Sequence, residues 1–275
     1  MALNYQLRRE KHAIGEFIAT LKFSAAVSAP TFAKIVPLLN EAAKELDLPA
    51  PMNVQVFNVA FGTPQMPPPP SGTGFQRFAA NGEIACSLWC DGDSISLTFR
   101  DYDRWKYILP KIVKTFSKIV PGYMAQVPAI HSFAVQYLNE FRGHKSSVQN
   151  AAELFKPKSQ WISPFSYNSN EAWHCHVGQF IPAEGDFRYL INVNFDVSPA
   201  AFPPENVVKN HVKVLILAAC HYDMPGKGPL ILQPVGIDKM IEDNFNNAHA
   251  LEKSLLAQII SDNYLAIMGE GAIEH

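Results

Sequence analysis

Apolar and polar residues alternate with a period of two along several stretches of this chain, which is the pattern of half-buried β-strands. The clearest example covers residues 84–90 and 94–99, which alternate on either side of the turn dipeptide Asp91-Gly92. An Asp-Gly pair between two alternating segments is a strong signal for a β-hairpin. The same alternation predicts further strands at residues 12–24, 53–61, 130–141, 173–179 and 187–197.

Other stretches repeat their apolar residues every three to four positions, which is the spacing of an amphipathic helix. The first such helix is expected at about 29–46, because Ser28 can cap it and Pro30 is tolerated in its first turn. The remaining helices are expected from about 101–103 onward, at about 204–222 and at about 243–261. Antiparallel hairpins interrupted by helices place the chain in the α+β class.

The predicted elements suggest an internal repeat. The hairpins that turn near Gly92 and Gly185 are each followed by a predicted helix. We therefore expect two similar β-hairpin-plus-helix halves, residues 1–145 and 146–275, packed together as one unit. Their sheet should be largely antiparallel, with the amphipathic helices packed on one side. The proline-rich segment 64–74 is expected to be a loop or arm of the first half, because its prolines favour an extended backbone.

Composition narrows the classes of partner. Charged residues make up only 17% of the 275 residues, and the formal net charge is -2. This balance argues against nucleic acid as a partner, because proteins that neutralise phosphates carry a basic excess. No stretch reaches the roughly 20 apolar residues of a membrane span, and the N-terminus lacks the apolar segment of a signal peptide, so no membrane partner is expected.

The four cysteines are expected to be reduced thiols of the hydrophobic core. They form no CxxC pair, and Cys86 and Cys90 share one face of a predicted strand with Leu88. Reduced core thiols are typical of a cytoplasmic protein, which is the location we expect. The chain also lacks a GxSxG elbow, a Walker loop and a dinucleotide fingerprint, so we expect neither a nucleophilic hydrolase nor a bound cofactor.

Histidines and one carboxylate form a candidate metal site. His174 and His176 share a face of a predicted strand, and His221 and Asp223 lie at the end of a predicted helix. Two or three imidazoles with one carboxylate suit zinc or iron, so a metal-dependent enzyme is the alternative hypothesis for this chain. The simpler interpretation is that His174 and His176 are solvated, because nothing in the sequence brings His221 near them.

Aromatic residues are the candidate anchors of a protein interface. Trp89 lies opposite the cysteines on its strand, Tyr102 precedes the helix that carries Trp105, and Trp161 lies in a turn-rich segment. Exposed aromatics of this kind bind partner proteins, whereas buried ones only fill a core. With no catalytic constellation in the sequence, we expect a non-enzymatic protein that binds another protein or a second copy of itself.

Three segments resemble a known family. The hairpin ending in SLTFRDYDRWKYI, the closing AHALEKSLLAQIISDNYLAIMGE and the opening HAIGEFIATLKF are similar to a sporadically distributed prokaryotic family of conserved hypothetical proteins. The proline that usually precedes the opening strand of that family is missing here. The matching residues are Tyr102, Trp105 and His249. The resemblance implies no activity, and the family's scattered occurrence suits antiphage or toxin–antitoxin genes.

His249 has two interpretations. It lies beside the apolar stripe of the predicted last helix, next to Ala248. We interpret it as a residue that forms a structural hydrogen bond between that helix and the sheet. The alternative is a role in partner binding, together with Tyr102, Trp105, Trp89 and Trp161.

Overall fold

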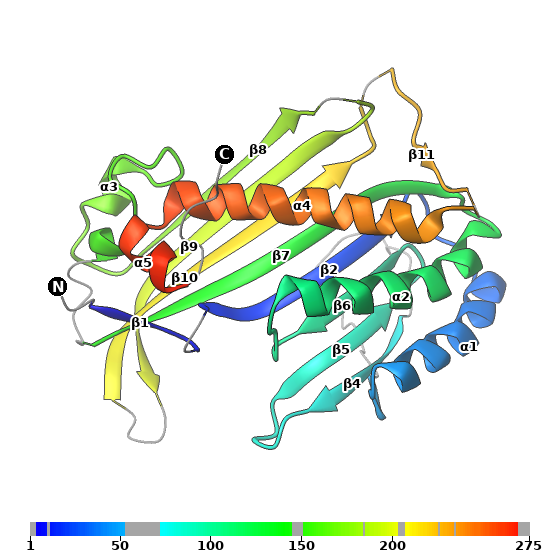
Figure 1. Cartoon of the computed structure of the whole chain (residues 1–275), viewed down its shortest axis with the longest axis horizontal. Helices are drawn as coiled ribbons and strands as arrows, with labels where there is room; N and C mark the ends of the chain where they lie inside the picture. Colours follow the sequence, from blue (N-terminus) through cyan, green and yellow to red (C-terminus); the bar gives the residue numbers. More distant parts are fainter. Residues whose placement is uncertain are drawn as a thin grey trace, which may run out of the picture.

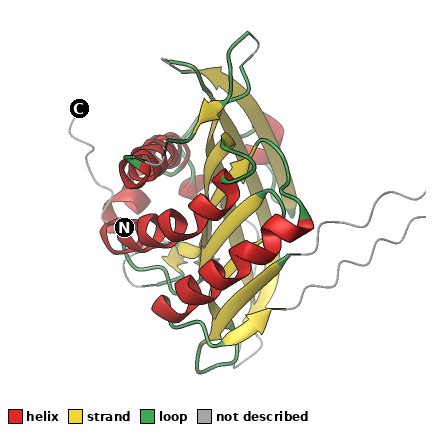
Figure 2. Cartoon of the chain, turned by 90° about the vertical axis from the view of Figure 1, so that its right-hand side faces the viewer, coloured by secondary structure: helices red, strands yellow, loops and turns green. Residues whose placement is uncertain are grey.

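One antiparallel sheet with helices on a single face forms the protein. The computed structural model describes residues 4–9, 12–52, 72–144, 151–183, 185–202, 207–224, 226–233 and 235–268. Within these residues the strands of the sheet follow the order β3-β4-β5-β6-β2-β7-β10-β9-β8, and β1 and β11 both pair with β7. Figure 2 shows the helices on one side of this sheet. The α+β class predicted from the sequence is therefore confirmed.

The strands alternate buried and partly exposed residues, as the sequence pattern predicted. The hairpin of β5 and β6 turns at Asp91, whose Oδ1 accepts hydrogen bonds from the backbone N–H groups of Asp93 at 3.0 Å and Ser94 at 2.8 Å. The strands are β1 (Tyr5–Leu7), β2 (Ile14–Phe23), β3 (Ala50–Met52), β4 (Thr73–Phe78), β5 (Ile84–Cys90), β6 (Ser94–Phe99), β7 (Ala129–Gly143), β8 (Trp173–Pro182), β9 (Arg188–Phe202), β10 (Val207–His221) and β11 (Leu230–Ile231).

The long helices pack their apolar stripes against the sheet. Figure 1 shows α4 lying across β10 and β7, with α2 and then α1 beside it. We call the opposite side of the sheet the open face. The helices are α1 (Ala29–Glu45), α2 (Trp105–Met124), α3 (Pro164–Tyr167), α4 (Ile237–Ile259) and α5 (Asp262–Ile267), with a short 3-10 helix at Ala151–Leu154. In the described part of the chain, none of the helices combines the length and apolar character needed to span a membrane.

The helix predicted at about 204–222 is wrong, because most of this segment is the strand β10. Its apolar residues, among them Val212, Val214 and Ile216, alternate and are fully buried on the helix-covered face. The run is apolar enough to fit a helical period as well, and β-branched residues favour the strand. The second hairpin is therefore followed by a third strand, and the expected repeat of two β-hairpin-plus-helix halves is not confirmed.

The two predicted halves share one sheet. β7 from residues 1–145 pairs antiparallel with β10 from residues 146–275 over most of its length. Of the proline-rich segment 64–74, only its last residues are described, and Thr73 begins β4. The strand predicted at 53–61 lies outside the described residues.

The cysteines behave as core residues. All four are free, and Cys86, Cys90 and Cys220 are buried while Cys175 is partly buried. Burial raises the pKa of the Cys86 and Cys220 thiols to about 12. These two thiols stay protonated near neutral pH and are poor nucleophiles, because the thiolate is the reactive form.

Candidate functional site

A cavity of about 420 Å³ lies on the helix-covered side of the sheet. It is enclosed by the start of α2, the second half of α4, the end of α5 and the strands β2 and β7, which Figure 1 shows close together. Among the described residues that line it are Tyr102, Trp105 and His249. The three residues that carry the family resemblance, which are far apart in the sequence, therefore meet at one cavity.

One wall of the cavity is a stack of two rings. The indole of Trp105 lies on the imidazole of His249 with ring centroids 4.2 Å apart and an interplanar angle of 18°. The indole Nε1 donates a hydrogen bond to Asn246 Oδ1 at 2.8 Å, and the Tyr137 hydroxyl lies 2.7 Å from His249 Nδ1. These contacts join α2, α4 and β7. The interpretation of His249 as a hydrogen-bonding residue between helix and sheet is confirmed.

His249 is neutral in this site. Burial, and then the nearby positive charge of Lys253, lower its pKa from the ordinary 6.5 to about 3. General acid–base catalysts work best with a pKa near the operating pH, and His249 lies far from it. The stack therefore favours binding over proton transfer.

Among the residues at the cavity is a buried polar side chain without a partner in the described part of the chain. Asn139 belongs to β7 and is 0% exposed. Neither its Nδ2 nor its Oδ1 has a hydrogen-bond partner among the described residues. An unsatisfied buried polar group costs about 1–3 kcal/mol, so native proteins rarely keep one without a reason. Because the side chain is 0% exposed, a molecule in the cavity reaches this donor and acceptor only when the side chains that cover Asn139 move aside.

Three cationic and two acidic side chains line the cavity. Arg104 and Lys106, both exposed, and Lys253 line it, together with the carboxylates of Asp103 and Glu252. The N-terminus of α2 also opens here, with no side-chain cap and no acidic residue in its first turn. The first N–H groups of a helix have no partner within it and carry partial positive charge. Together with the excess of cationic side chains, they favour an anionic group.

The predicted interface anchors differ in exposure. Tyr102 is only 4% and Trp161 only 3% exposed, so neither side chain lies on the surface of this chain, and their role in partner binding stays a prediction. Both fill the core, and the Trp161 indole donates a hydrogen bond to Gln258 Oε1 at 3.2 Å. Trp105 is partly buried in the cavity wall. Trp89 is partly exposed on the open face, opposite the buried cysteines as predicted.

Sequence reasoning missed Tyr137, Asn139 and Glu252 in this cavity. Glu252 is only 2% exposed on α4 and lines the site beside His249. The sequence did contain a signal for Asn139. The other residues on its face of β7 are buried apolar or aromatic residues, and Asn139 is the polar exception. A polar residue in a buried register marks either a hydrogen-bonded core position or a site.

The four-residue metal set predicted from the sequence does not assemble. His176 pairs with Asn194, and Asn194 pairs in turn with Leu215. Leu215 precedes His221 by six residues of β10, a separation of about 20 Å along a strand. His174 and His176 are exposed on β8, as the simpler interpretation expected.

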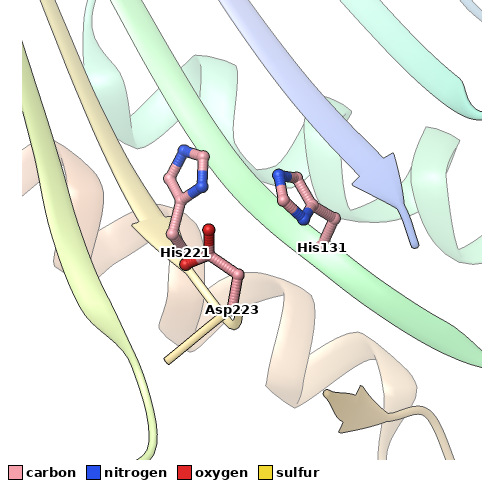
Figure 3. A group of neighbouring side chains, drawn as sticks. All are labelled: His131, His221 and Asp223. Carbon is pink, nitrogen blue, oxygen red and sulfur yellow. The ribbon is translucent and has the colours of Figure 1, made fainter. Parts of the chain in front are cut away.

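His221 and Asp223 do meet a third ligand-type residue, His131 of β7, which the sequence analysis did not single out. Figure 3 shows the two imidazoles and the carboxylate close together. Burial, and then the neighbouring His131, lower the pKa of His221. The hydrogen bonds from Arg188 lower the pKa of Asp223. At neutral pH this cluster therefore offers a neutral His221 imidazole and a charged Asp223 carboxylate.

Comparison with known proteins adds no relative: no protein-family model matches the chain, and no curated protein matches it. The resemblance to the prokaryotic family stays a prediction. Function is therefore inferred from the geometry of the two sites.

Proposed function

We propose that this chain is a non-enzymatic binding protein that takes up a small anionic molecule in the cavity between α2, α4 and the sheet. The cavity volume, about 420 Å³, falls in the range of small-molecule sites. The observation that carries the proposal is the buried, unpartnered carboxamide of Asn139. A ligand that moves aside the side chains covering Asn139 would supply the missing hydrogen bonds and recover the free energy lost by burying the group.

The lining narrows the chemistry of the ligand. Asn139 complements a group that presents an acceptor beside a donor, as an amide does. Arg104, Lys106 and the N-terminus of α2 complement a carboxylate or phosphate. The stacked pair of Trp105 and His249 keeps the wall rigid, which reduces the entropy lost on binding. Because attraction by exposed charged side chains is screened by salt, binding should weaken as ionic strength rises.

Asn139→Leu is expected to abolish ligand retention without harming the fold. Leucine has nearly the shape of asparagine and no polar atoms, so it removes both the ligand's partner and the burial cost. We expect the ligand-free variant to gain about 1–3 kcal/mol in free energy of unfolding over ligand-free wild type, measured by urea denaturation. In native mass spectra of protein purified gently without chelators, the wild type should carry one small molecule above 30.6 kDa and the variant none.

A matched control is Gln136→Leu, the same type of change on the same strand. Gln136 points to the open face, away from the cavity, so this variant should keep the ligand. The proposal fails if the wild type has the bare mass of the chain, or if Asn139→Leu retains the ligand as the wild type does.

A second proposal keeps the expected binding of another protein, in the form of a second copy of this chain. Its support is the open face, which none of the described helices covers and which carries partly exposed apolar residues on central strands. These are Ile18, Leu138, Leu190, Leu215 and Leu217. In sedimentation velocity, wild type should form dimers with rising concentration and Leu215→Glu should stay monomeric. Monomeric wild type up to high concentration would count against it.

The expected cytoplasmic location is kept as a proposal, supported by the free cysteines. An origin in antiphage or toxin–antitoxin genes is likewise only implied by the family resemblance. Neither affects the binding experiments.

A further inference from the structure

A cluster of metal-ligand type lies at the far end of the sheet from the cavity, on β7 and β10. His131 comes from β7, His221 is the last residue of β10, and Asp223 follows two residues later. One potential ligand atom from each lies within 4.8 Å of the others. The two imidazole rings have centroids 5.0 Å apart and are nearly perpendicular, at 81°. Figure 3 shows the carboxylate close beside both rings.

The backbone places His131 in this cluster through an irregularity of the sheet. In the β2–β7 pairing, Lys22 pairs with Ser132 and Phe23 pairs with Ile130, so His131 is left without a partner in the register. Such bulges re-aim side chains and are common beside functional sites. The backbone N–H of Tyr222 donates to the carbonyl of His131 at 2.9 Å, which fixes the segment between His221 and Asp223 against β7.

Neighbouring residues orient the carboxylate. Arg188 donates from Nε and Nη2 to the two oxygens of Asp223, both at 2.9 Å. The guanidinium also stacks over Phe180, 3.8 Å from the ring centroid. A carboxylate oxygen that accepts one hydrogen bond keeps a further lone pair for a metal ion, and such outer contacts are typical of metal sites. His221 Nδ1 is buried and has no hydrogen-bond partner among the described residues.

We propose that His131, His221 and Asp223 bind a divalent first-row transition metal ion of the zinc class. Two imidazole nitrogens and one carboxylate oxygen are ligands that such ions accept, at about 2.0–2.2 Å. On a tetrahedral ion these ligand atoms lie about 3.3 Å apart, so the side chains must close by roughly 1–2 Å from their present spacing. Because Arg188 offsets the single carboxylate charge, the site disfavours Ca²⁺ and Mg²⁺, which need several oxygen ligands.

Three protein ligands leave one position of a tetrahedral ion open. His131 and His221 are partly exposed and Asp223 is exposed, so water or a solute has access to that position. The site is independent of the cavity, with which it shares none of its three residues.

The test uses the full chain, treated with a chelator and then dialysed free of it. Calorimetric titration with Zn²⁺ should show one ion per chain for wild type, and His131→Ala or His221→Ala should weaken binding by at least about 100-fold, beyond the loss typical of an outer-contact variant. The matched control is the double variant His174→Ala, His176→Ala, which removes two exposed histidines of the same sheet. It should bind Zn²⁺ as wild type does.

Absorption of the Co²⁺-loaded wild type keeps the test decisive should a variant fold poorly. Visible bands without a thiolate charge-transfer band would agree with nitrogen and oxygen ligands. A thiolate band would assign the ion to a cysteine and overturn the proposal. Three results of the Zn²⁺ titration would also overturn the proposal. They are a wild type that binds no stoichiometric Zn²⁺, a His131→Ala variant that binds with full affinity, and a His174→Ala, His176→Ala double variant that loses binding.

Discussion

Trp105→Ala is expected to lower the free energy of unfolding by about 3–5 kcal/mol, the largest effect we predict for a single residue. The indole stacks on His249, lies edge-on to Phe17 with ring centroids 5.9 Å apart, and donates a hydrogen bond to Asn246. Alanine would lose all three contacts and enlarge the cavity beside them. Urea denaturation of the purified variant measures the loss.

Two variants separate this effect from the general cost of removing a tryptophan. Trp89→Ala, on the open face, should cost less, because the described residues give Trp89 neither a ring stack nor an indole hydrogen bond like those of Trp105. Trp105→Phe keeps a ring over His249 and should recover part of the loss. If Trp105→Ala and Trp89→Ala lower the free energy of unfolding equally, the stack with His249 adds nothing to the general cost of removing a tryptophan.

Stability is expected to fall as the pH drops from about 6.5 to about 3, because of His249. Its pKa in the folded protein is about 3, below the 6.5 of the unfolded chain, so acid protonates the unfolded state first and favours it. The stability that neutral His249 contributes is complete above pH 6.5 and disappears as the pH approaches 3. The slope for one proton is about 1.4 kcal/mol per pH unit, which totals several kcal/mol over this window.

His249→Gln should flatten this slope, since glutamine can still meet the Tyr137 hydroxyl and does not titrate. The measurement is urea denaturation at a series of pH values, with the difference between variant and wild type taken at each. An unchanged slope between pH 6.5 and 4.5 would show that His249 is not held neutral by the fold.

Glu140 provides the control for that experiment because its carboxyl group affects stability in a lower pH range than His249 does. Burial by itself would raise its pKa, but the hydrogen bond from Arg8 and the His211 imidazole, whose Nε2 lies 3.5 Å from Glu140 Oε1, outweigh burial and hold the pKa at about 2. A carboxyl with a lowered pKa stabilises the fold above its ordinary pKa of about 4.5 and loses that effect as the pH falls to about 2. Glu140→Gln should therefore leave the slope above pH 5 as in wild type.

Local patterns were sufficient for much of the fold. The hairpin of β5 and β6 follows from alternation and one Asp-Gly turn, and the bounds of α1 agree closely with a cap and an apolar stripe. These signals come from residues near one another in the chain. β10 is different, because its apolar run suits a strand and a helix. Pairing with β7 and β9, distant in sequence, decided between them.

The sites depended more heavily on the tertiary structure. Tyr102, Trp105 and His249 could be singled out from the sequence by resemblance, but as parts of an interface. Only the packing of α2 against α4 stacks Trp105 on His249 and buries Tyr102. Asn139 could be noticed in the sequence as a polar residue at a position where β7 otherwise buries apolar ones. Its lack of a hydrogen-bond partner depends on which side chains surround it in the folded chain.

The sequence by itself determined the α+β class, the antiparallel hairpins, the long helices and the core thiols, because periodicity and turn chemistry are local properties. The tertiary structure decided which histidines could share a metal ion. It separated His176 from His221 by strand register and brought in His131 through a bulge. Register and bulges depend on hydrogen bonds between distant strands, and no pattern within a single segment specifies them.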